Sequence, residues 1–182
     1  MNVLIGDSQA EGLKPSFSSR PDWRVFDHRG WSTRRLRDEV LDAALALRPS
    51  LVVFVTGGND DPDSASLPEV VRSTAERVRR AGAQLVWVGP VFAKVMPDAV
   101  VHPRTAAVMR AALEGKPGVR YVDAQALTRD LARSENVHLT AAGYRAYAQR
   151  LEAAMRSGSS SAALGVAAFL AVAIGAWALA RR

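Results

Sequence analysis

Short apolar runs alternate along the chain with segments in which apolar residues recur at helical spacing. The runs are rich in Val, Leu and Ile, and Leu51–Thr56 is an almost continuous apolar stretch, as expected for a strand covered on both faces. The five predicted strands are Asn2–Gly6, Arg24–Asp27, Leu51–Thr56, Gln84–Val88 and Val119–Asp123.

The segments between the strands have the spacing of helices. Ser32 is placed to cap the first of them, and Ser66–Glu69 has the composition of a capping box. The predicted helices are one on which Leu36, Val40, Ala44 and Leu47 share a face, one that opens at Ser66–Glu69, one over Thr105–Leu113, and one that follows Thr140 and presents Tyr144, Tyr147, Leu151 and Met155. Repeated strand–helix alternation predicts an α/β fold of three layers, α/β/α, with a five-stranded parallel sheet that binds ligands at the carboxyl ends of its strands.

The chain changes character after residue 156. Residues 157–161, Ser-Gly-Ser-Ser-Ser, have the composition of a flexible linker, and residues 162–180 contain no charged or strongly polar side chain. At about 1.5 Å per residue this segment reaches roughly 28 Å, close to the thickness of a hydrocarbon core. We therefore predict a globular domain over 1–156 and a transmembrane helix over 162–180, with 181–182 as a basic tail. The alternative is a buried or amphipathic terminal helix, but the segment has no polar face.

Two further expectations concern this segment and its orientation. Small residues recur every fourth position along it, at Ala163, Ala167, Ala171 and Gly175, so that two copies could pack closely and self-associate. The first predicted strand begins at Asn2, which leaves no room for a signal peptide. We therefore expect a single-pass C-terminal anchor with the domain on the cytoplasmic side, although arginines flank the segment at both ends and charge does not choose the orientation.

The composition narrows the classes of partner. The chain of 182 residues has a net charge of +6, most of it from arginines that are scattered rather than gathered in one run. No nucleic-acid-binding motif accompanies them, so no nucleic-acid partner is expected. The chain contains no cysteine, which excludes disulfides and thiolate metal sites.

Residues suited to nucleophilic catalysis lie at the ends of predicted strands. Gly6-Asp7-Ser8 ends the first strand and heads a helix, and Gly57-Gly58-Asn59-Asp60 follows the third strand. Taken alone, the first motif is also typical of a helix N-cap and the second of a β-turn. Of the three histidines, only His138 has an acidic residue, Glu135, three positions before it. One short loop can then present an imidazole and the carboxylate that orients it.

The order of these motifs over residues 1–156 resembles the SGNH (GDSL-like) hydrolase family. The resemblance implies a flavodoxin-like arrangement of the sheet, Ser8 as the nucleophile and His138 as the base. It also implies an oxyanion hole formed by the backbone N–H groups of Ser8 and Gly30 and by the Asn59 amide. The resemblance also implies that Glu135 completes a catalytic triad with Ser8 and His138. The family normally has aspartate at the position of Glu135. Neither a metal nor another cofactor is implied.

The expected function is that of a serine esterase. Its substrate would be a small acyl ester, a carbohydrate O-acetyl group or a lysolipid, cleaved through an acyl-enzyme on Ser8. Arg29, Trp31 and Asp60 are weaker candidates for substrate contacts. The arginines near Gly30 could instead form a solvated helix face; they are Arg29, Arg34, Arg35 and Arg37. The alternative is a membrane-tethered binding protein on the same fold whose active site has decayed. A flavodoxin-like nucleotide binder would need a glycine-rich phosphate loop, which the sequence lacks.

Overall fold

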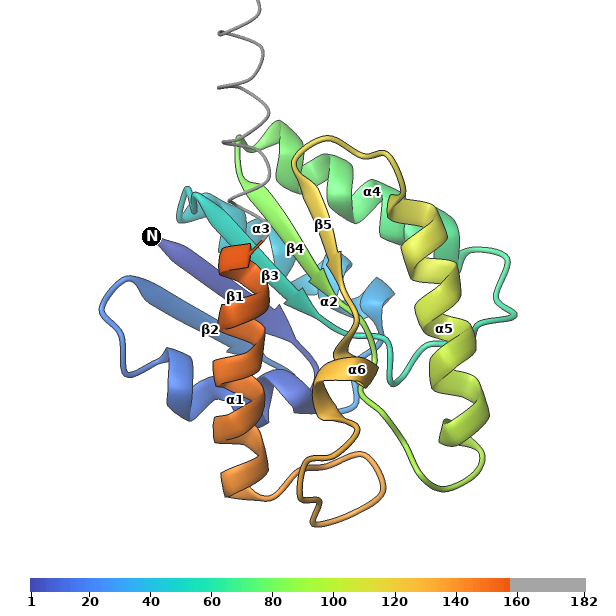
Figure 1. Ribbon diagram of the computed structural model, residues 1–182. Helices are drawn as coiled ribbons and strands as arrows, with labels where there is room; N and C mark the ends of the chain where they lie inside the picture. The colour runs from blue at the N-terminus through green and yellow to red at the C-terminus, as the bar shows by residue number, and fades with distance from the viewer. Residues whose placement is uncertain (158–182) are drawn as a thin grey trace, which may run out of the picture.

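The computed structural model describes residues 1–157 and confirms the predicted three-layer α/β/α architecture (Figure 1). Five parallel strands form one sheet in the order β2-β1-β3-β4-β5. The strands are β1 (Asn2–Gly6), β2 (Trp23–Asp27), β3 (Leu51–Val55), β4 (Gln84–Val88) and β5 (Val119–Val122), each within one residue of its predicted bounds.

Helices cover both faces of this sheet. They are α1 (Ser8–Phe17), α2 (Thr33–Glu39), α3 (Leu41–Ala46), α4 (Leu67–Arg80), α5 (Asp98–Leu113), α6 (Ala124–Thr128) and a last helix over residues 141–157. The alternation of side chains along β1 divides the core in two. Val3 and Ile5 pack with helices α2 to α5, whereas Leu4 packs with α1 and with Tyr147 of the last helix.

Several helix boundaries differ from the predictions. The helix expected from Leu36 to Leu47 is broken at Val40, and Leu47 is 41% exposed. Ser66 makes no capping hydrogen bond to α4, because its backbone is already helical (φ −87°, ψ −15°) and its hydroxyl accepts from Arg34. Helix α5 begins at Asp98 rather than Thr105, and the short helix α6 was not predicted.

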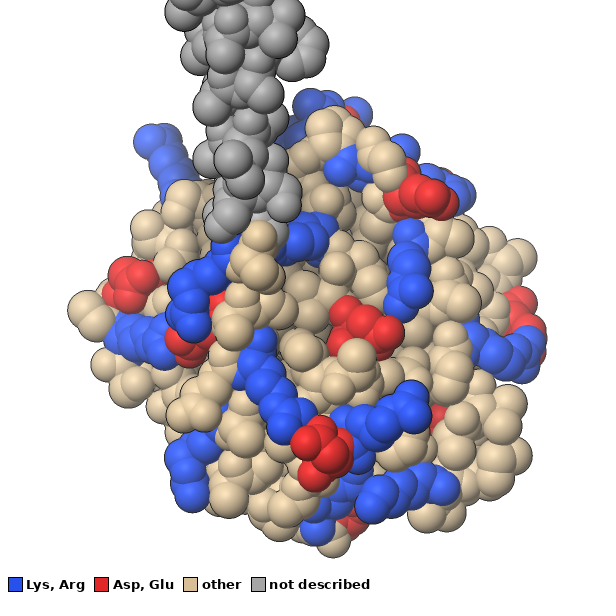
Figure 2. Space-filling model, in the orientation of Figure 1, with Lys and Arg blue, Asp and Glu red and all other residues tan. Residues whose placement is uncertain are grey.

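The surface of the described residues carries charges of both signs. Basic and acidic side chains are interspersed over the face seen in Figure 2, and many arginines are ion-paired.

Ser157, assigned by sequence to the linker, still belongs to the last helix. This helix ends near the amino ends of the strands, where Arg120 of β5 donates to the carbonyl of Met155 (2.8 Å).

The predicted membrane span, 162–180, lies outside the described residues, as do the basic tail and the rest of the linker. None of the helices within residues 1–157 is long and apolar enough to span a bilayer.

Candidate active site

Ser8 lies at the carboxyl end of β1, as the first residue of α1. The strand passes so close to β3 that a Cβ on Gly6 would lie 2.2 Å from the carbonyl oxygen of Val55, so only glycine fits there. The next residue, Asp7, caps the helix by accepting a hydrogen bond from the Gln9 N–H (2.9 Å). The hydroxyl of Ser8 is therefore held at the ligand-binding edge of the sheet by two neighbouring elements.

The structure brings Ser8 together with His138 and Glu135, which come from the loop before the last helix. The Nε2 atom of His138 lies 3.1 Å from the Ser8 hydroxyl, and its Nδ1 atom lies 3.0 Å from a carboxylate oxygen of Glu135. Because a carboxylate only accepts, Nδ1 carries the proton and Nε2 is free to take the proton of the serine. The three side chains form a hydrogen-bonded chain of the kind that activates a serine nucleophile.

The loop that carries His138 is fixed from several sides. The carbonyl of His138 accepts from the N–H groups of Ser134 (3.0 Å) and Glu135 (3.3 Å), which closes a tight turn between the base and its carboxylate. Gln9, one residue after the nucleophile, donates to the carbonyl of Val137 (3.1 Å). These bonds hold the imidazole over the start of α1.

Asn136, between Glu135 and His138, ties this loop to the loop that precedes α5. Its side-chain oxygen accepts from the N–H groups of Lys94 (3.0 Å) and Val95 (2.8 Å). Its amide donates to the carbonyl of Val95 (3.2 Å) and to the carboxylate of Asp98 (2.9 Å). Asn136 was not predicted as a site residue, since an asparagine in a loop carries no spacing signal of its own.

The predicted oxyanion donors face the same hollow as the nucleophile. Ser8, Gly30, Asn59 and His138 all line a pocket of about 230 Å³ at the carboxyl ends of β1, β3 and β4. Gly30 has a φ of 75°, a conformation in which glycine is favoured. The Asn59 amide lies 3.3 Å from both the Asp7 carboxylate and the carbonyl of Trp31. It is thus held beside the nucleophile by two acceptors.

Buried carboxyl groups lie beneath the pocket. Burial raises the pKa of Asp7 to about 7; the hydrogen bond from Gln9 opposes this rise, and the nearby charge of Asp60 adds to it. Burial also raises the pKa of Asp60, against the hydrogen bonds that it accepts from Thr33. Asp7 therefore caps α1, accepts a hydrogen bond from the Asn59 amide and has a pKa near neutral pH.

Arg29 and Trp31 are two of the three weaker candidates for substrate contacts, and they take different positions. Arg29 lines the pocket, and its guanidinium pairs with Glu11 (3.0 Å). Trp31 stacks on His28, with a centroid separation of 4.1 Å, and lies under the guanidinium of Arg35 (3.9 Å).

The carboxylate of Asp60 points toward α2. It accepts from the Thr33 N–H (3.1 and 3.2 Å) and from the Thr33 hydroxyl (2.6 Å). Both of its oxygens are thus engaged in fixing the start of α2.

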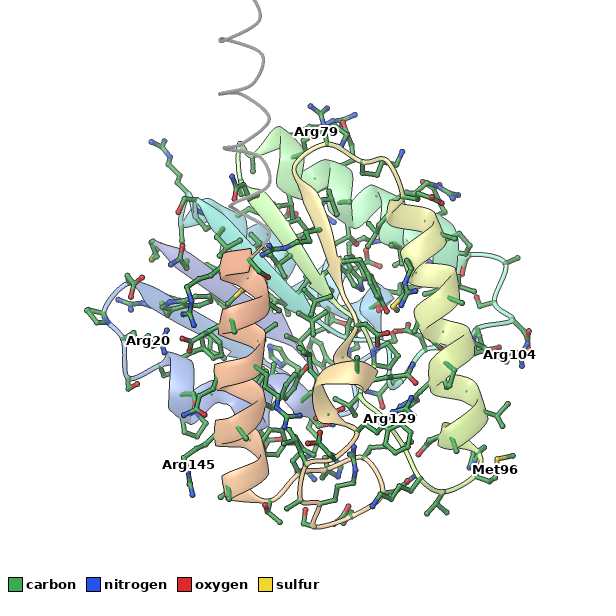
Figure 3. The ribbon with its side chains drawn as sticks, viewed as in Figure 1. Arg20, Arg79, Met96, Arg104, Arg129 and Arg145 are labelled. Carbon is green, nitrogen blue, oxygen red and sulfur yellow. The ribbon has the colours of Figure 1, made fainter. Side chains whose placement is uncertain are left out.

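His102 is a pocket residue that was not predicted from the sequence, because no acidic residue stands three positions before it. It lies on α5, is 2% exposed, and lines the same pocket as Ser8 and His138. At the foot of that helix, Met96 projects into solvent (Figure 3). Among residues 1–157, no three His, Asp or Glu side chains gather in a group that could hold a metal ion.

Comparisons with known proteins identify the family of the chain and relate its fold to solved structures. Residues 4–146 match the model of the GDSL-like lipase/acylhydrolase family. The catalytic domain of the Streptococcus pneumoniae peptidoglycan O-acetyltransferase A has a similar fold, with a TM-score of 0.67 and 20% identity over 87% of this chain and 94% of that one. No curated protein matches the chain.

Two further solved structures share the fold. A GDSL-like lipase from Bacteroides thetaiotaomicron has a TM-score of 0.66 and 15% identity, over 86% of this chain and 88% of that one. A catalytic mutant of an acetylxylan esterase from Geobacillus stearothermophilus has a TM-score of 0.60 and 16% identity, over 81% of this chain and 90% of that one.

Proposed function

The chain belongs to the GDSL-like lipase/acylhydrolase family and is an ester-hydrolysing enzyme, and we propose that it forms its acyl-enzyme on Ser8. The observation that carries this proposal is the hydrogen-bonded chain from the Ser8 hydroxyl through His138 to Glu135, with distances of 3.1 and 3.0 Å. All three of these side chains are present and hydrogen-bonded to one another, which also argues against the alternative of a decayed site that only binds.

The chemistry follows from the positions of the atoms. Nε2 of His138 takes the hydroxyl proton as the Ser8 oxygen attacks the ester carbonyl, and the imidazolium then protonates the departing alcohol. The negative charge on the former carbonyl oxygen is held by the N–H groups of Ser8 and Gly30 and by the Asn59 amide. Water, deprotonated by the same nitrogen, attacks the acyl-enzyme and releases the acid.

The size of the pocket favours a short acyl group. Its volume of about 230 Å³ lies below the range of roughly 300–1,000 Å³ typical of sites for drug-sized ligands. We propose that the substrate is a small acyl ester, such as an O-acetyl group on a carbohydrate. The acetylxylan esterase and the peptidoglycan O-acetyltransferase with the same fold support this choice.

The proposal is tested by labelling the chain with a fluorophosphonate and by assaying p-nitrophenyl esters of increasing acyl length. Wild-type protein should carry the label on Ser8 and should prefer acetate over octanoate. Ser8→Ala should lose the label and roughly 10⁴–10⁶ of the rate. A label on another serine, or turnover that survives the substitution, would refute the assignment.

We also propose that residues 162–180 attach the enzyme to a membrane, a proposal supported by the sequence of that segment alone. The full chain should remain with the membrane fraction after a wash in alkaline carbonate, and a chain ending at residue 157 should not. Full-length protein in the carbonate supernatant would refute the anchor.

A further inference from the structure

One end of the active-site pocket is built by α5 and by the segment that follows β4. Gly89, Pro90 and Val91 line it from the end of β4, and Asp98 and His102 line it from α5. This end has no role in the ester chemistry just described. It is nevertheless part of the same hollow as Ser8 and His138, so a substrate bound for attack can reach it.

The hydrogen bonding of His102 fixes which of its nitrogens carries a proton. Its Nδ1 atom lies 2.8 Å from the carbonyl oxygen of Val91, inside the protein. A carbonyl only accepts, so Nδ1 donates, and in the neutral ring Nε2 is then left with a free lone pair. The residue is 2% exposed, so its packing holds the ring in this orientation.

The free nitrogen lies beside Gly58, another residue that lines the pocket. A Cβ built on Gly58 would lie 3.6 Å from Nε2 of His102, and Gly58 itself lines the pocket next to the oxyanion residue Asn59. The same Cβ would lie 3.8 Å from a carboxylate oxygen of Asp7, so the missing side chain of Gly58 leaves room beside the imidazole, next to the residues that hold the ester carbonyl.

The second polar side chain at this end is also an acceptor. Asp98, one helical turn before His102, lines the pocket and already accepts from the amide of Asn136 (2.9 Å). The wall thus offers a lone pair and a carboxylate, and Pro90 contributes no N–H at all. A buried acceptor that meets only apolar substrate atoms remains unpaired, which is unfavourable.

We infer that His102 is a specificity-determining residue whose Nε2 accepts a hydrogen bond from a hydroxyl group of the substrate, close to the ester. The inference rests on the proposed esterase function and narrows its substrate to hydroxylated esters. The hydroxyl can belong to the acyl group, as in a hydroxy acid, or to the alcohol, as in a sugar or polyol. Both sources present the same donor to the same nitrogen.

Two pairs of esters of equal size test the inference and separate the two sources. Methyl glycolate and methyl propionate differ only by a hydroxyl in place of a methyl on the acyl side. The pair 2-hydroxyethyl acetate and propyl acetate differs in the same way on the alcohol side. Wild-type enzyme should prefer the hydroxylated member of one pair by roughly tenfold or more in kcat/KM, and the pair that responds identifies the source.

The matched variant is His102→Asn, in which the amide N–H can still donate to the carbonyl of Val91 while nothing replaces Nε2. It should lose the preference for the hydroxylated ester and keep kcat/KM for the other member within about threefold. His28→Asn is the control, since His28 stacks on Trp31, and it should leave the preference unchanged. An equal loss on all four esters, or no preference in the wild type, would overturn the inference.

A readout without turnover keeps the inference separate from the esterase function. In ¹⁵N spectra of the Ser8→Ala protein, His102 should show a protonated Nδ1 and a bare Nε2, and only the hydroxylated esters should shift the Nε2 resonance. A protonated Nε2, or equal shifts with both members of each pair, would overturn the role of His102. A wild-type enzyme that hydrolyses none of the four esters and takes no label on Ser8 would instead refute the proposed function.

Discussion

Nδ1 of His138 lies 3.0 Å from a carboxylate oxygen of Glu135, three residues earlier in the same loop. Glutamate is one methylene longer than the aspartate usual in the family. It reaches the imidazole because the N–H groups of Ser134 and Glu135 bond to the His138 carbonyl and close the turn between the two residues. The Glu135 side chain is 74% exposed, whereas that of His138 is 24% exposed. Solvent therefore screens the stabilisation that this carboxylate gives to the imidazolium.

Substitution of Glu135 should reduce kcat by less than the roughly 10⁴-fold known for a buried triad aspartate. We expect Glu135→Ala to lose about 10- to 10³-fold, and Glu135→Gln nearly as much, because a neutral amide does not stabilise the cation. Glu135→Asp should keep substantial activity, since the charge remains and only its reach changes. Steady-state rates on p-nitrophenyl acetate measure this series, and Glu114→Gln, an exposed residue outside the pocket, is the control. If all three variants stay within about threefold of wild type, Ser8 and His138 act as a dyad.

Asn59 should act mainly in the transition state. Its amide lies near two acceptors at 3.3 Å, a long distance for hydrogen bonds, and an oxyanion would be a stronger acceptor. Asn59→Ala should therefore lower kcat by roughly 10²–10³ with little change in KM. Initial rates over a range of p-nitrophenyl acetate concentrations separate the two constants. A higher KM at unchanged kcat would make Asn59 a residue that binds the ground state.

Asn136 should position the catalytic loop through the four hydrogen bonds that it makes to Lys94, Val95 and Asp98. Asn136→Ala should lower kcat and the rate of fluorophosphonate labelling of Ser8 in parallel, by about tenfold or more, since a displaced imidazole activates the serine poorly. Lys94→Ala is the matched control, because Lys94 contributes only its backbone N–H, and it should behave as wild type. A variant that loses thermal stability but labels at the normal rate would limit Asn136 to a structural role.

Asp7 should make stability depend on pH. Its pKa is about 7 in the folded protein against an ordinary value of 3.8, so the folded state holds this proton more tightly than the unfolded state. The resulting stabilisation is fully present below the unfolded value and is lost as the pH rises through about 7. Asp7→Asn keeps an N-cap side chain and removes the titration. Between pH 4 and 8, the free energy of unfolding measured in urea should fall more in the wild type than in the variant. Parallel curves would contradict the shifted pKa.

The sequence by itself determined the strands and the local half of the site. Strands buried on both faces must be apolar along their whole length, so β1, β3 and β4 stand out as short runs of Val, Leu and Ile. The pairing of Glu135 with His138 was also predicted from their spacing, because a short loop can present two side chains three residues apart to each other.

Tertiary structure decided the remainder. The cap of α4 was mispredicted because the backbone of Ser66 is itself helical, and its hydroxyl instead accepts a hydrogen bond from Arg34 of α2. Ser8 and His138 are 130 residues apart, and they meet only because parallel strands bring their carboxyl ends to one edge. No sequence motif predicts which ring nitrogen of His102 carries the proton. The carbonyl of Val91, which the fold places beside Nδ1, decides this and leaves Nε2 for the substrate. Distant contacts of this kind leave no period or spacing in a sequence.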